Sequence, residues 1–193
     1  MSTQPKPYIT PEQYLEIERA AEFRSEYFDG EMFAMSGGTL DHATIKENLA
    51  AILTVQLRGS QCRSASSDLR LQTHPRGPYF YPDIVVFCGQ PKLSDSRRDM
   101  LGDATVIIEI LSPSTERYDR TFKFEHYRRL PSIRDYIVIA QDRVSVEHKT
   151  RQSDNSWEMR ETSDMDAVVQ LPSIECSFRV ADVYYRVDFN TVE

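Results

Sequence analysis

Two short runs of branched and aromatic residues, 81–88 and 104–111, each contain one acidic residue, and this pairing limits how the chain can fold. Asp83 stands near the head of the first run, and Glu109 stands inside the second, between two isoleucines. Both runs have the composition of buried strands. A lone buried carboxylate costs several kcal/mol unless it is protonated, paired or bound to a metal. Two such acids on neighbouring strands therefore suggest a metal site built into a sheet.

Each acid also has a simpler interpretation. Asp83 follows Pro82 and can bond the backbone N–H groups at the start of its strand. Glu109 can point to solvent, because an antiparallel sheet often has one wet face. If the two strands are antiparallel neighbours, however, both carboxylates lie at the same edge of the sheet. With water and the backbone carbonyl of Ile110, they would offer the oxygen ligands that Mg²⁺ or Mn²⁺ prefers.

The surrounding segments predict a mixed α/β fold (an α+β mixed sheet). A chain of 193 residues with 40% hydrophobic content suffices for one core, so we expect a single domain over 1–193 with a flexible N-terminus at 1–7. A helix between 104–111 and 134–140 permits a crossover and a parallel strand pair, whereas the three strands before it suggest an antiparallel meander. We therefore expect a central mixed β-sheet flanked by helices.

Capping and turn signals place the remaining elements. Thr10 with Gln13 predicts a helix start, Asp29-Gly30 predicts a hairpin, and Asp41 can cap a second helix. The expected elements are helices over 10–21, 42–58, 115–130 and 179–185, a hairpin over 26–33, strands over 68–72, 83–88, 104–111, 134–140 and 143–148, and a mobile loop over 89–103.

Composition and charge exclude several classes of protein. No run approaches the roughly 18 apolar residues of a membrane helix, and the start lacks a signal-peptide pattern, so we expect a cytoplasmic protein with no membrane partner. Three widely spaced cysteines argue against a disulfide framework and a zinc ribbon. A net charge of −7 argues against strong non-specific nucleic-acid binding. Basic residues nevertheless crowd one expected helix: Arg117, Arg120, Lys123, Arg128 and Arg129.

Lys123 is a third candidate for chemistry. It follows Glu109 by 14 positions (123 − 109), one to two turns into the helix after that strand. Its side chain could reach back to the strand end, orient an attacking water and stabilise charge on a phosphate. A solvated lysine on a charged helix is the simpler alternative. Tyr127, four residues further on the same helical face, is a lower-ranked candidate, because such a residue is more often a packing residue than a catalytic one.

The order and spacing of these motifs resemble the Uma family of putative restriction endonucleases, which is common in cyanobacteria. The matching segments are Pro82-Asp83, Glu109-Ile-Leu-Ser-Pro-Ser-Thr115 and Asp119-x-x-x-Lys123-x-x-x-Tyr127, within a resemblance that spans residues 8–188. The resemblance implies a fold of the PD-(D/E)XK nuclease superfamily, with Asp83 and Glu109 as the motif acids. The usual motif lysine, two residues after the glutamate, is Leu111 here, which makes Lys123 its natural replacement.

The resemblance also suggests lower-ranked site residues. Many nucleases of this superfamily use an acid on the first core helix, for which Glu47 is a candidate by position, and Glu26 fits an acidic position typical of the family. Asp68 lies on the adjoining strand and could help to bind metal, although an exposed aspartate is the simpler interpretation. His42 and Asn48 match family positions without an evident chemical role, so a capping or core-polar role is expected for each.

These observations favour a Mg²⁺- or Mn²⁺-dependent endonuclease of restriction type that hydrolyses phosphodiester bonds of DNA. A homodimer is expected by analogy, because cutting two strands needs two sites. The alternative is a binding or assembly module that keeps the nuclease fold without robust catalysis, which the acidic net charge favours. The complete set of Asp83, Glu109 and Lys123 separates the two, since a decayed site tends to lose one of the three.

Overall fold

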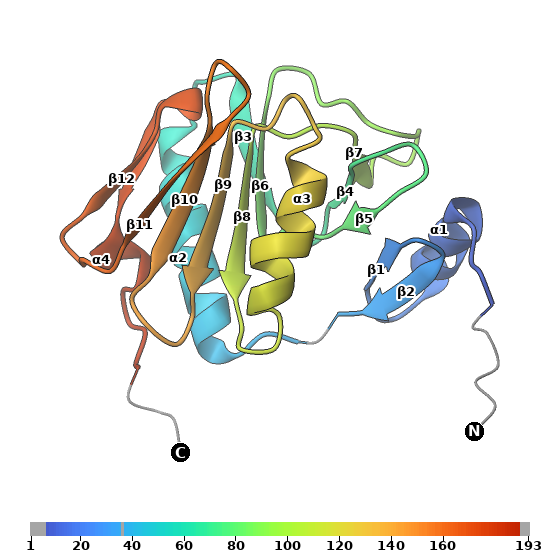
Figure 1. The fold of residues 1–193 in the computed structure, drawn as a ribbon, viewed down its shortest axis with the longest axis horizontal. Helices are drawn as coiled ribbons and strands as arrows, with labels where there is room; N and C mark the ends of the chain where they lie inside the picture. Colours follow the sequence, from blue (N-terminus) through green and yellow to red (C-terminus); the bar gives the residue numbers. More distant parts are fainter. Residues whose placement is uncertain (1–6, 36, 190–193) are drawn as a thin grey trace.

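The chain, described by a computed structural model over residues 7–35 and 37–189, is built on a six-stranded sheet (Figure 1). The strand order is β11-β10-β9-β8-β6-β3, and β8 and β9 run parallel while the other neighbours are antiparallel. The strands are β3 (Cys62–Ser66), β6 (Ile84–Cys88), β8 (Val106–Leu111), β9 (Asp135–Ala140), β10 (Val146–Arg151) and β11 (Trp157–Thr162). The central strands β8 and β9 are buried throughout, as their apolar sequences predict.

Helices cover both faces of this sheet (Figure 1). One face carries α2 (Leu40–Gln56), the hairpin of β12 (Val168–Leu171) and β13 (Cys176–Arg179), the 3₁₀ turn Pro172–Ile174 and α4 (Val180–Val183). There Ile45 and Leu49 of α2 share one apolar core with Ile108 of β8. The opposite face carries the π-helix η1 (Tyr118–Lys123) and α3 (Phe124–Tyr127), whose Phe124 and Tyr127 pack in a second core with Ile107.

A smaller five-stranded sheet carries the N-terminal part of the chain in the order β2-β1-β5-β4-β7. Its strands are β1 (Ser25–Phe28), β2 (Glu31–Ala34), β4 (Arg70–Gln72), β5 (Tyr79–Phe80) and β7 (Met100–Leu101). Helix α1 (Pro11–Ala20) packs on it through Tyr14, whose ring centroid lies 4.9 Å from that of Tyr27 and 5.2 Å from that of Tyr79. This packing fixes β1, which brings Glu26 toward the central sheet.

The fold class predicted from the sequence is confirmed: a mixed sheet flanked by helices. At the start of α1, Thr10 and Gln13 form the expected reciprocal capping box. The hairpin turns at Asp29-Gly30 between β1 and β2. The helical segment after β8 crosses over to the parallel strand β9, as its length permitted.

Several elements differ from the expectation. Strand β3 was not predicted, because Cys-Arg-Ser-Ala-Ser lacks an apolar alternation, and it takes the place in the meander expected for 68–72, which lies in the smaller sheet. Thr39 rather than Asp41 caps α2, since its side chain accepts from the N–H of His42. The loop 89–103 contains β7, whose two residues are buried.

The cysteine expectation needs a correction. Cys62 and Cys88 form a disulfide between the edge strand β3 and β6, where they stand directly opposite each other. Their 26-residue separation in the sequence concealed this register, while Cys176 is a free, buried thiol. The predicted flexible N-terminus, 1–7, lies outside the described residues except for Pro7. Within the described residues, no helix is both long and apolar enough to cross a membrane.

Candidate active site

Asp83 and Glu109 face each other across two antiparallel strands. β6 pairs with β8 in a register that sets Ile84 opposite Ile108, so residue 83 follows opposite residue 109. The backbone N–H of Asp83 donates to Glu109 Oε2 at 3.3 Å, and the N–H of Ile110 donates to Asp83 Oδ2 at 2.8 Å. The two acids therefore lie side by side at one edge of the pairing, as expected for antiparallel neighbours.

The backbone carbonyl of Ile110 lies on the same side of β8 as Asp83. In an extended strand, the N–H and C=O of one residue point toward the same neighbouring strand. Because the N–H of Ile110 bonds to Asp83, its carbonyl also faces the side on which Asp83 lies. Two carboxylates and one carbonyl are thus available together, and these are the oxygen donors that hard divalent cations prefer.

Lys123 reaches the acids from the helical segment above the sheet. Its Nζ lies 3.2 Å from Glu109 Oε1, 3.1 Å from Glu26 Oε1 and 3.1 Å from Asp119 Oδ1. Its side chain is only 9% exposed. The turn that holds Asp119 and Lys123 is a π-helix, a rare conformation that is frequent at functional sites. This turn buries the aspartate and the lysine together against the sheet.

The pocket holds more negative than positive charge. The carboxylates of Glu26, Asp83, Glu109 and Asp119 line it beside the ammonium of Lys123. Burial raises the pKa of Glu109 well above its usual range, and the other three acids add to the rise although Lys123 opposes it. Burial alone would lower the pKa of Lys123, but the surrounding carboxylates outweigh it and raise that pKa. The lysine therefore stays charged, and the surplus of negative charge around it favours the binding of a further cation.

Two more side chains hold the acids in place. Tyr127 donates its O–H to Glu109 Oε1 at 2.9 Å, and burial raises the pKa of Tyr127, so it stays a neutral donor. His42, in the first turn of α2, places Nε2 3.3 Å from Asp83 Oδ2. Gly38 leaves room for that ring, because a Cβ there would lie 2.8 Å from His42 Nδ1. Each motif acid thus has a partner on a different helix.

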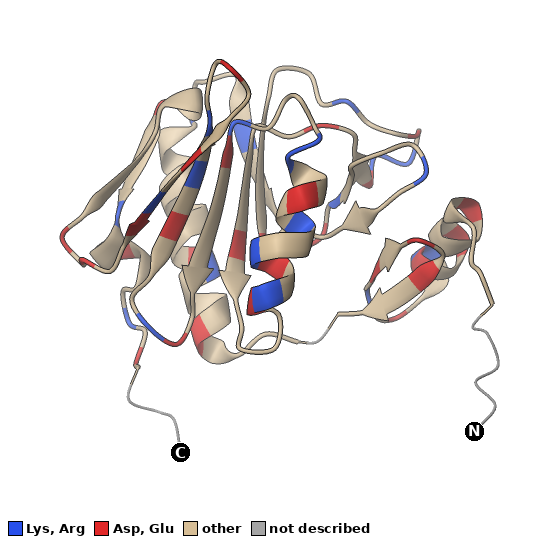
Figure 2. Cartoon of the chain, viewed as in Figure 1, with Lys and Arg blue, Asp and Glu red and all other residues tan. Residues whose placement is uncertain are grey.

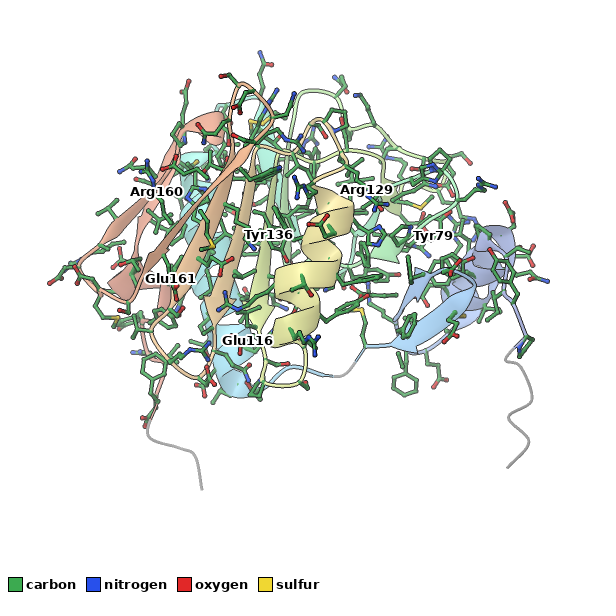
Figure 3. The ribbon with its side chains drawn as sticks, viewed as in Figure 1. Tyr79, Glu116, Arg129, Tyr136, Arg160 and Glu161 are labelled. Atoms are coloured by element: carbon green, nitrogen blue, oxygen red, sulfur yellow. A yellow bond between two sulfur atoms is a disulfide. The ribbon has the colours of Figure 1, made fainter. Side chains whose placement is uncertain are left out.

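The four carboxylates, Lys123 and His42 line a pocket of about 550 Å³ that opens to solvent, a volume typical of ligand sites. Acidic and basic residues are interspersed along the η1–α3 segment that covers β8 (Figure 2). Tyr136 of β9 lies under that segment and donates its O–H to the carbonyl of Asp119 at 2.8 Å (Figure 3). The π turn is therefore fixed to the sheet from below, while its lysine points into the pocket.

The lower-ranked candidates divide into two groups. Glu26 and Tyr127 reach the cluster, one through Lys123 and the other through Glu109. Glu47 instead lies exposed on α2 and does not line the pocket. The side chain of Asp68 is 83% exposed and pairs with Arg24, which lies just before β1. The structure therefore leaves Glu47 and Asp68 away from the other candidates.

Asp119 and His42 also line the pocket, although neither was ranked as a site residue from the sequence. Asp119 stands four positions before Lys123, a spacing that places both on one helical face and could have drawn attention to it. His42 was expected to be a capping or core-polar residue, and its position beside Asp83 depends on how α2 crosses the sheet. No local pattern in the sequence reports such a crossing.

The donors present fit a divalent cation in kind. Within the described residues, no three acidic, histidine or cysteine side chains are grouped as ligands of a single ion, and Lys123 stands between the carboxylates instead. Asp119 Oδ1, however, is buried and accepts no hydrogen bond although it lies near the lysine. With the oxygens of Asp83, Glu109 and Ile110 side by side, the donor set suits Mg²⁺ or Mn²⁺.

Comparison with known proteins places this chain in a family. The Uma2 family, described as "Putative restriction endonuclease", matches residues 11–183. The chain belongs to this family. The matched span contains Asp83 together with Lys123 and its three carboxylate partners Glu26, Glu109 and Asp119, and it confirms the resemblance that the motifs indicated.

Two relatives of this Uma2 protein come from Synechocystis sp. (strain ATCC 27184 / PCC 6803 / Kazusa). The uncharacterized protein slr1290 is 35% identical over 182 residues, which cover 94% of each chain. The uncharacterized protein sll1609 is 30% identical over 162 residues, which cover 84% of this chain and 92% of its own. Both likenesses therefore extend over nearly the whole length of the relatives.

A solved structure has the same fold. The crystal structure of a "putative nuclease belonging to DUF820" from Anabaena variabilis ATCC 29413 matches with a TM-score of 0.75. The match covers 91% of this chain and 97% of that chain at 21% sequence identity. At this identity the likeness supports the shared architecture rather than a shared substrate.

Proposed function

We propose that this Uma2 protein is a Mg²⁺- or Mn²⁺-dependent endonuclease of restriction type that hydrolyses phosphodiester bonds of DNA. The observation that carries the proposal is the pairing of Asp83 with Glu109 in one pocket, with the ammonium of Lys123 3.2 Å from the glutamate. The description of the family as "Putative restriction endonuclease" and of the Anabaena protein as a "putative nuclease" supports the same chemistry.

Each residue of the cluster has a part in such a reaction. Asp83, Glu109 and the carbonyl of Ile110 would hold the ion, which when bound lowers the pKa of a water and neutralises charge on the phosphate. Hydrolysis joins the water oxygen to phosphorus, breaks one phosphorus–oxygen ester bond and returns a proton to the departing oxygen. Lys123 would turn an N–H from the carboxylates to the attacking water or to a phosphate oxygen. Tyr127 keeps Glu109 oriented throughout.

The setting of the enzyme belongs to the same proposal. We propose that residues 1–193 form one domain that acts in the cytoplasm, where DNA is accessible, and that two copies assemble because two strands need two sites. The contacts that hold Lys123 among three carboxylates favour the alternative, a nuclease-fold binding or assembly module, because they must rearrange before the lysine meets substrate.

Cleavage of supercoiled plasmid by the pure protein tests the proposed function. Wild type should nick or linearise the plasmid with Mg²⁺ or Mn²⁺ and not with EDTA. Asp83→Asn keeps the shape of the side chain and removes its charge, so it should abolish cleavage. Asp68→Asn makes the same chemical change at an exposed position and should leave cleavage unchanged. Cleavage that survives EDTA or Asp83→Asn would refute the assignment, and a wild type that binds DNA without cutting it would favour the binding module.

A further inference from the structure

Strand β11 is one edge of the six-stranded sheet, and its inner side is hydrogen-bonded to β10. It is the first strand in the sheet order and pairs with β10 along its whole length, from Arg151 opposite Trp157 to Val146 opposite Thr162 (Figure 1). Met159, at its middle, is 58% exposed although it is apolar. The labelled side chains of Arg160 and Glu161 lie on this side of the molecule, far from the N-terminal hairpin (Figure 3). A sheet edge of this length offers a template for pairing with another strand.

The hydrogen bonds of β10 show which backbone groups of β11 point away from β10. Arg151 donates its N–H to the carbonyl of Arg134 at 2.8 Å, and Ala140 donates to the carbonyl of Ser145 at 3.0 Å, so the odd-numbered residues of β10 bond to β9. The even-numbered residues of β10 therefore bond to β11. In the register of β10 with β11, these stand opposite the even-numbered residues of β11. The N–H and C=O groups of Trp157, Met159 and Glu161 consequently point away from the sheet.

This geometry restricts how two copies of β11 could pair. An antiparallel ladder sets an outward-facing residue opposite an outward-facing residue. Around a two-fold axis, the central registers place Met159 opposite Met159, Trp157 opposite Met159, or Met159 opposite Glu161. These registers differ in the charges that meet on the neighbouring residues.

The charges of Glu158 and Arg160 select one of these registers. With Met159 opposite Met159, Glu158 of each copy stands opposite Arg160 of the other. With Trp157 opposite Met159, Glu158 stands opposite Glu158, and with Met159 opposite Glu161, Arg160 stands opposite Arg160. Opposite charges directly across two strands are favourable, whereas like charges are unfavourable. The first register is therefore self-complementary and the other two are not.

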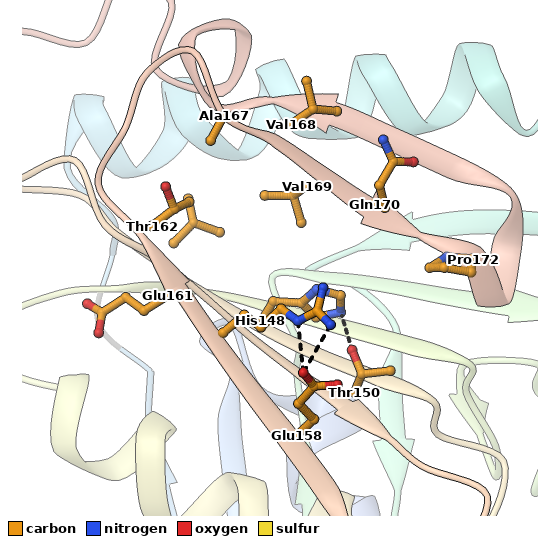
Figure 4. Close-up of a pocket in the computed structure, with 12 residues that line it drawn as sticks. His148, Thr150, Glu158, Glu161, Thr162, Ala167, Val168, Val169, Gln170 and Pro172 are labelled. Atoms are coloured by element: carbon orange, nitrogen blue, oxygen red, sulfur yellow. Dashed lines mark hydrogen bonds and ion pairs between the residues drawn. The ribbon is translucent and has the colours of Figure 1, made fainter.

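We propose that two copies of this chain pair through β11, with Met159 on the two-fold axis, and join their central sheets into one continuous sheet. Glu158 and Arg160 occupy non-hydrogen-bonded positions of the new ladder, where side chains lie closest. Within one chain they already form an ion pair at 3.0 Å on the face that borders the pocket beside β12 (Figure 4). In the dimer, the two Glu158 and the two Arg160 side chains would alternate in charge around the two-fold axis, and each Met159 would be covered by the Met159 of the other copy.

The same charges explain why a second copy is favoured over an arbitrary strand. Charged side chains on an edge strand usually discourage pairing, because a foreign strand leaves them unpaired. On β11, however, the two signs stand two residues apart and match a reversed copy of themselves. An isologous contact of this kind repeats each favourable pair by symmetry. The surface therefore fits a second copy of this chain better than an unrelated strand.

Charge reversal tests this interface independently of any nuclease activity. Analytical ultracentrifugation over a concentration series should show wild type dimerising. Arg160→Glu should weaken the dimer by about tenfold or more, because both cross-copy pairs become repulsive. Exchanging the two charges, with Glu158→Arg and Arg160→Glu together, should restore it. Arg160 is 78% exposed, so these variants should keep the wild-type circular dichroism spectrum.

Arg63→Glu is the matched control, because it reverses an exposed arginine on β3, the opposite edge of the same sheet. It should leave the dimer unchanged. The proposal is overturned by a wild type that stays monomeric across the series, by an Arg160→Glu dimer as tight as wild type, or by a double exchange that fails to restore association. A dimer that Arg63→Glu weakens as much as Arg160→Glu would place the interface at β3 and also overturn it.

Discussion

Replacing Lys123 by methionine, in the absence of metal, should strongly destabilise the fold. Methionine keeps most of the length of the side chain but removes the charge that three carboxylates surround at 3.1, 3.1 and 3.2 Å. The lysine and all three acids are less than a tenth exposed. Removing one partner of such a buried pair typically costs about 3–5 kcal/mol, because the remaining charges are left without compensation. For a chain of this length, that loss lowers the melting temperature by about 6–20 °C.

Urea denaturation followed by circular dichroism, with EDTA present, measures this loss as a change in midpoint at constant slope. Lys92→Met provides the control, because Lys92 is 76% exposed and lies 3.4 Å from Asp103. That exposed pair should contribute less than about 1 kcal/mol. A loss for Lys123→Met no larger than that of the control would refute the view of Lys123 as a buried counter-ion. A second substitution, Glu26→Gln, should recover part of the stability by removing one uncompensated charge.

Three further predictions concern the metal, the pH and the cysteines. Saturating Mg²⁺ should raise the melting temperature of wild type, because a hundredfold excess of the ion over its Kd adds about 2.7 kcal/mol to the free energy of unfolding. It should not raise the melting temperature of Asp83→Asn, and an equal rise in both proteins would remove Asp83 from the site. Burial lowers the pKa of His126 below 6.5 in the folded protein, so the unfolded chain binds more protons below pH 6.5. The free energy of unfolding should therefore fall as the pH drops from 6.5 toward the folded pKa. His126→Phe should lose this pH dependence, and an unchanged dependence would assign it to another group. Unfolded, unreduced protein should expose one reactive thiol and reduced protein three, since Cys62 and Cys88 are bonded; three without reductant would contradict the bond.

The sequence predicted the parts of this fold that depend on local chemistry. The capping box at Thr10 needs only three neighbouring positions, and the hairpin at Asp29-Gly30 needs only a turn that favours positive φ. The apolar runs around Asp83 and Glu109 predicted buried strands, and antiparallel pairing then followed as one of few options. These features were readable because the interactions that stabilise them lie within a few residues of one another.

Features that depend on distant partners could not be predicted from the sequence in the same way. Strand β3 has no apolar alternation of its own and exists because β6 offers it an open edge. Cys62 becomes a disulfide partner of Cys88 only through that pairing. Thr39 caps α2 although Asp41 has an equally suitable side chain, because the helix begins at Leu40. The strand and the disulfide are decided by tertiary register rather than by local sequence.

The candidate site shows the same division. Asp83 and Glu109 were selected by their unusual placement in apolar runs, and Lys123 was selected by its spacing together with the family resemblance; the structure brings the three together. Asp119 was missed because an aspartate on a charged helix resembles a solvated residue until the π turn buries it. The family resemblance supplied the link between strand and helix that spacing alone left open.

Anomalous diffraction from crystals soaked in Mn²⁺ tests the central claim, that the opposed acids form a metal site, most directly. A peak within coordination distance of the carboxylates of both Asp83 and Glu109 is predicted, and it should disappear in crystals of Asp83→Asn. A strong peak that touches neither carboxylate, or a site that stays empty in crystals whose Mn²⁺ concentration exceeds the Kd measured in solution, would contradict the claim.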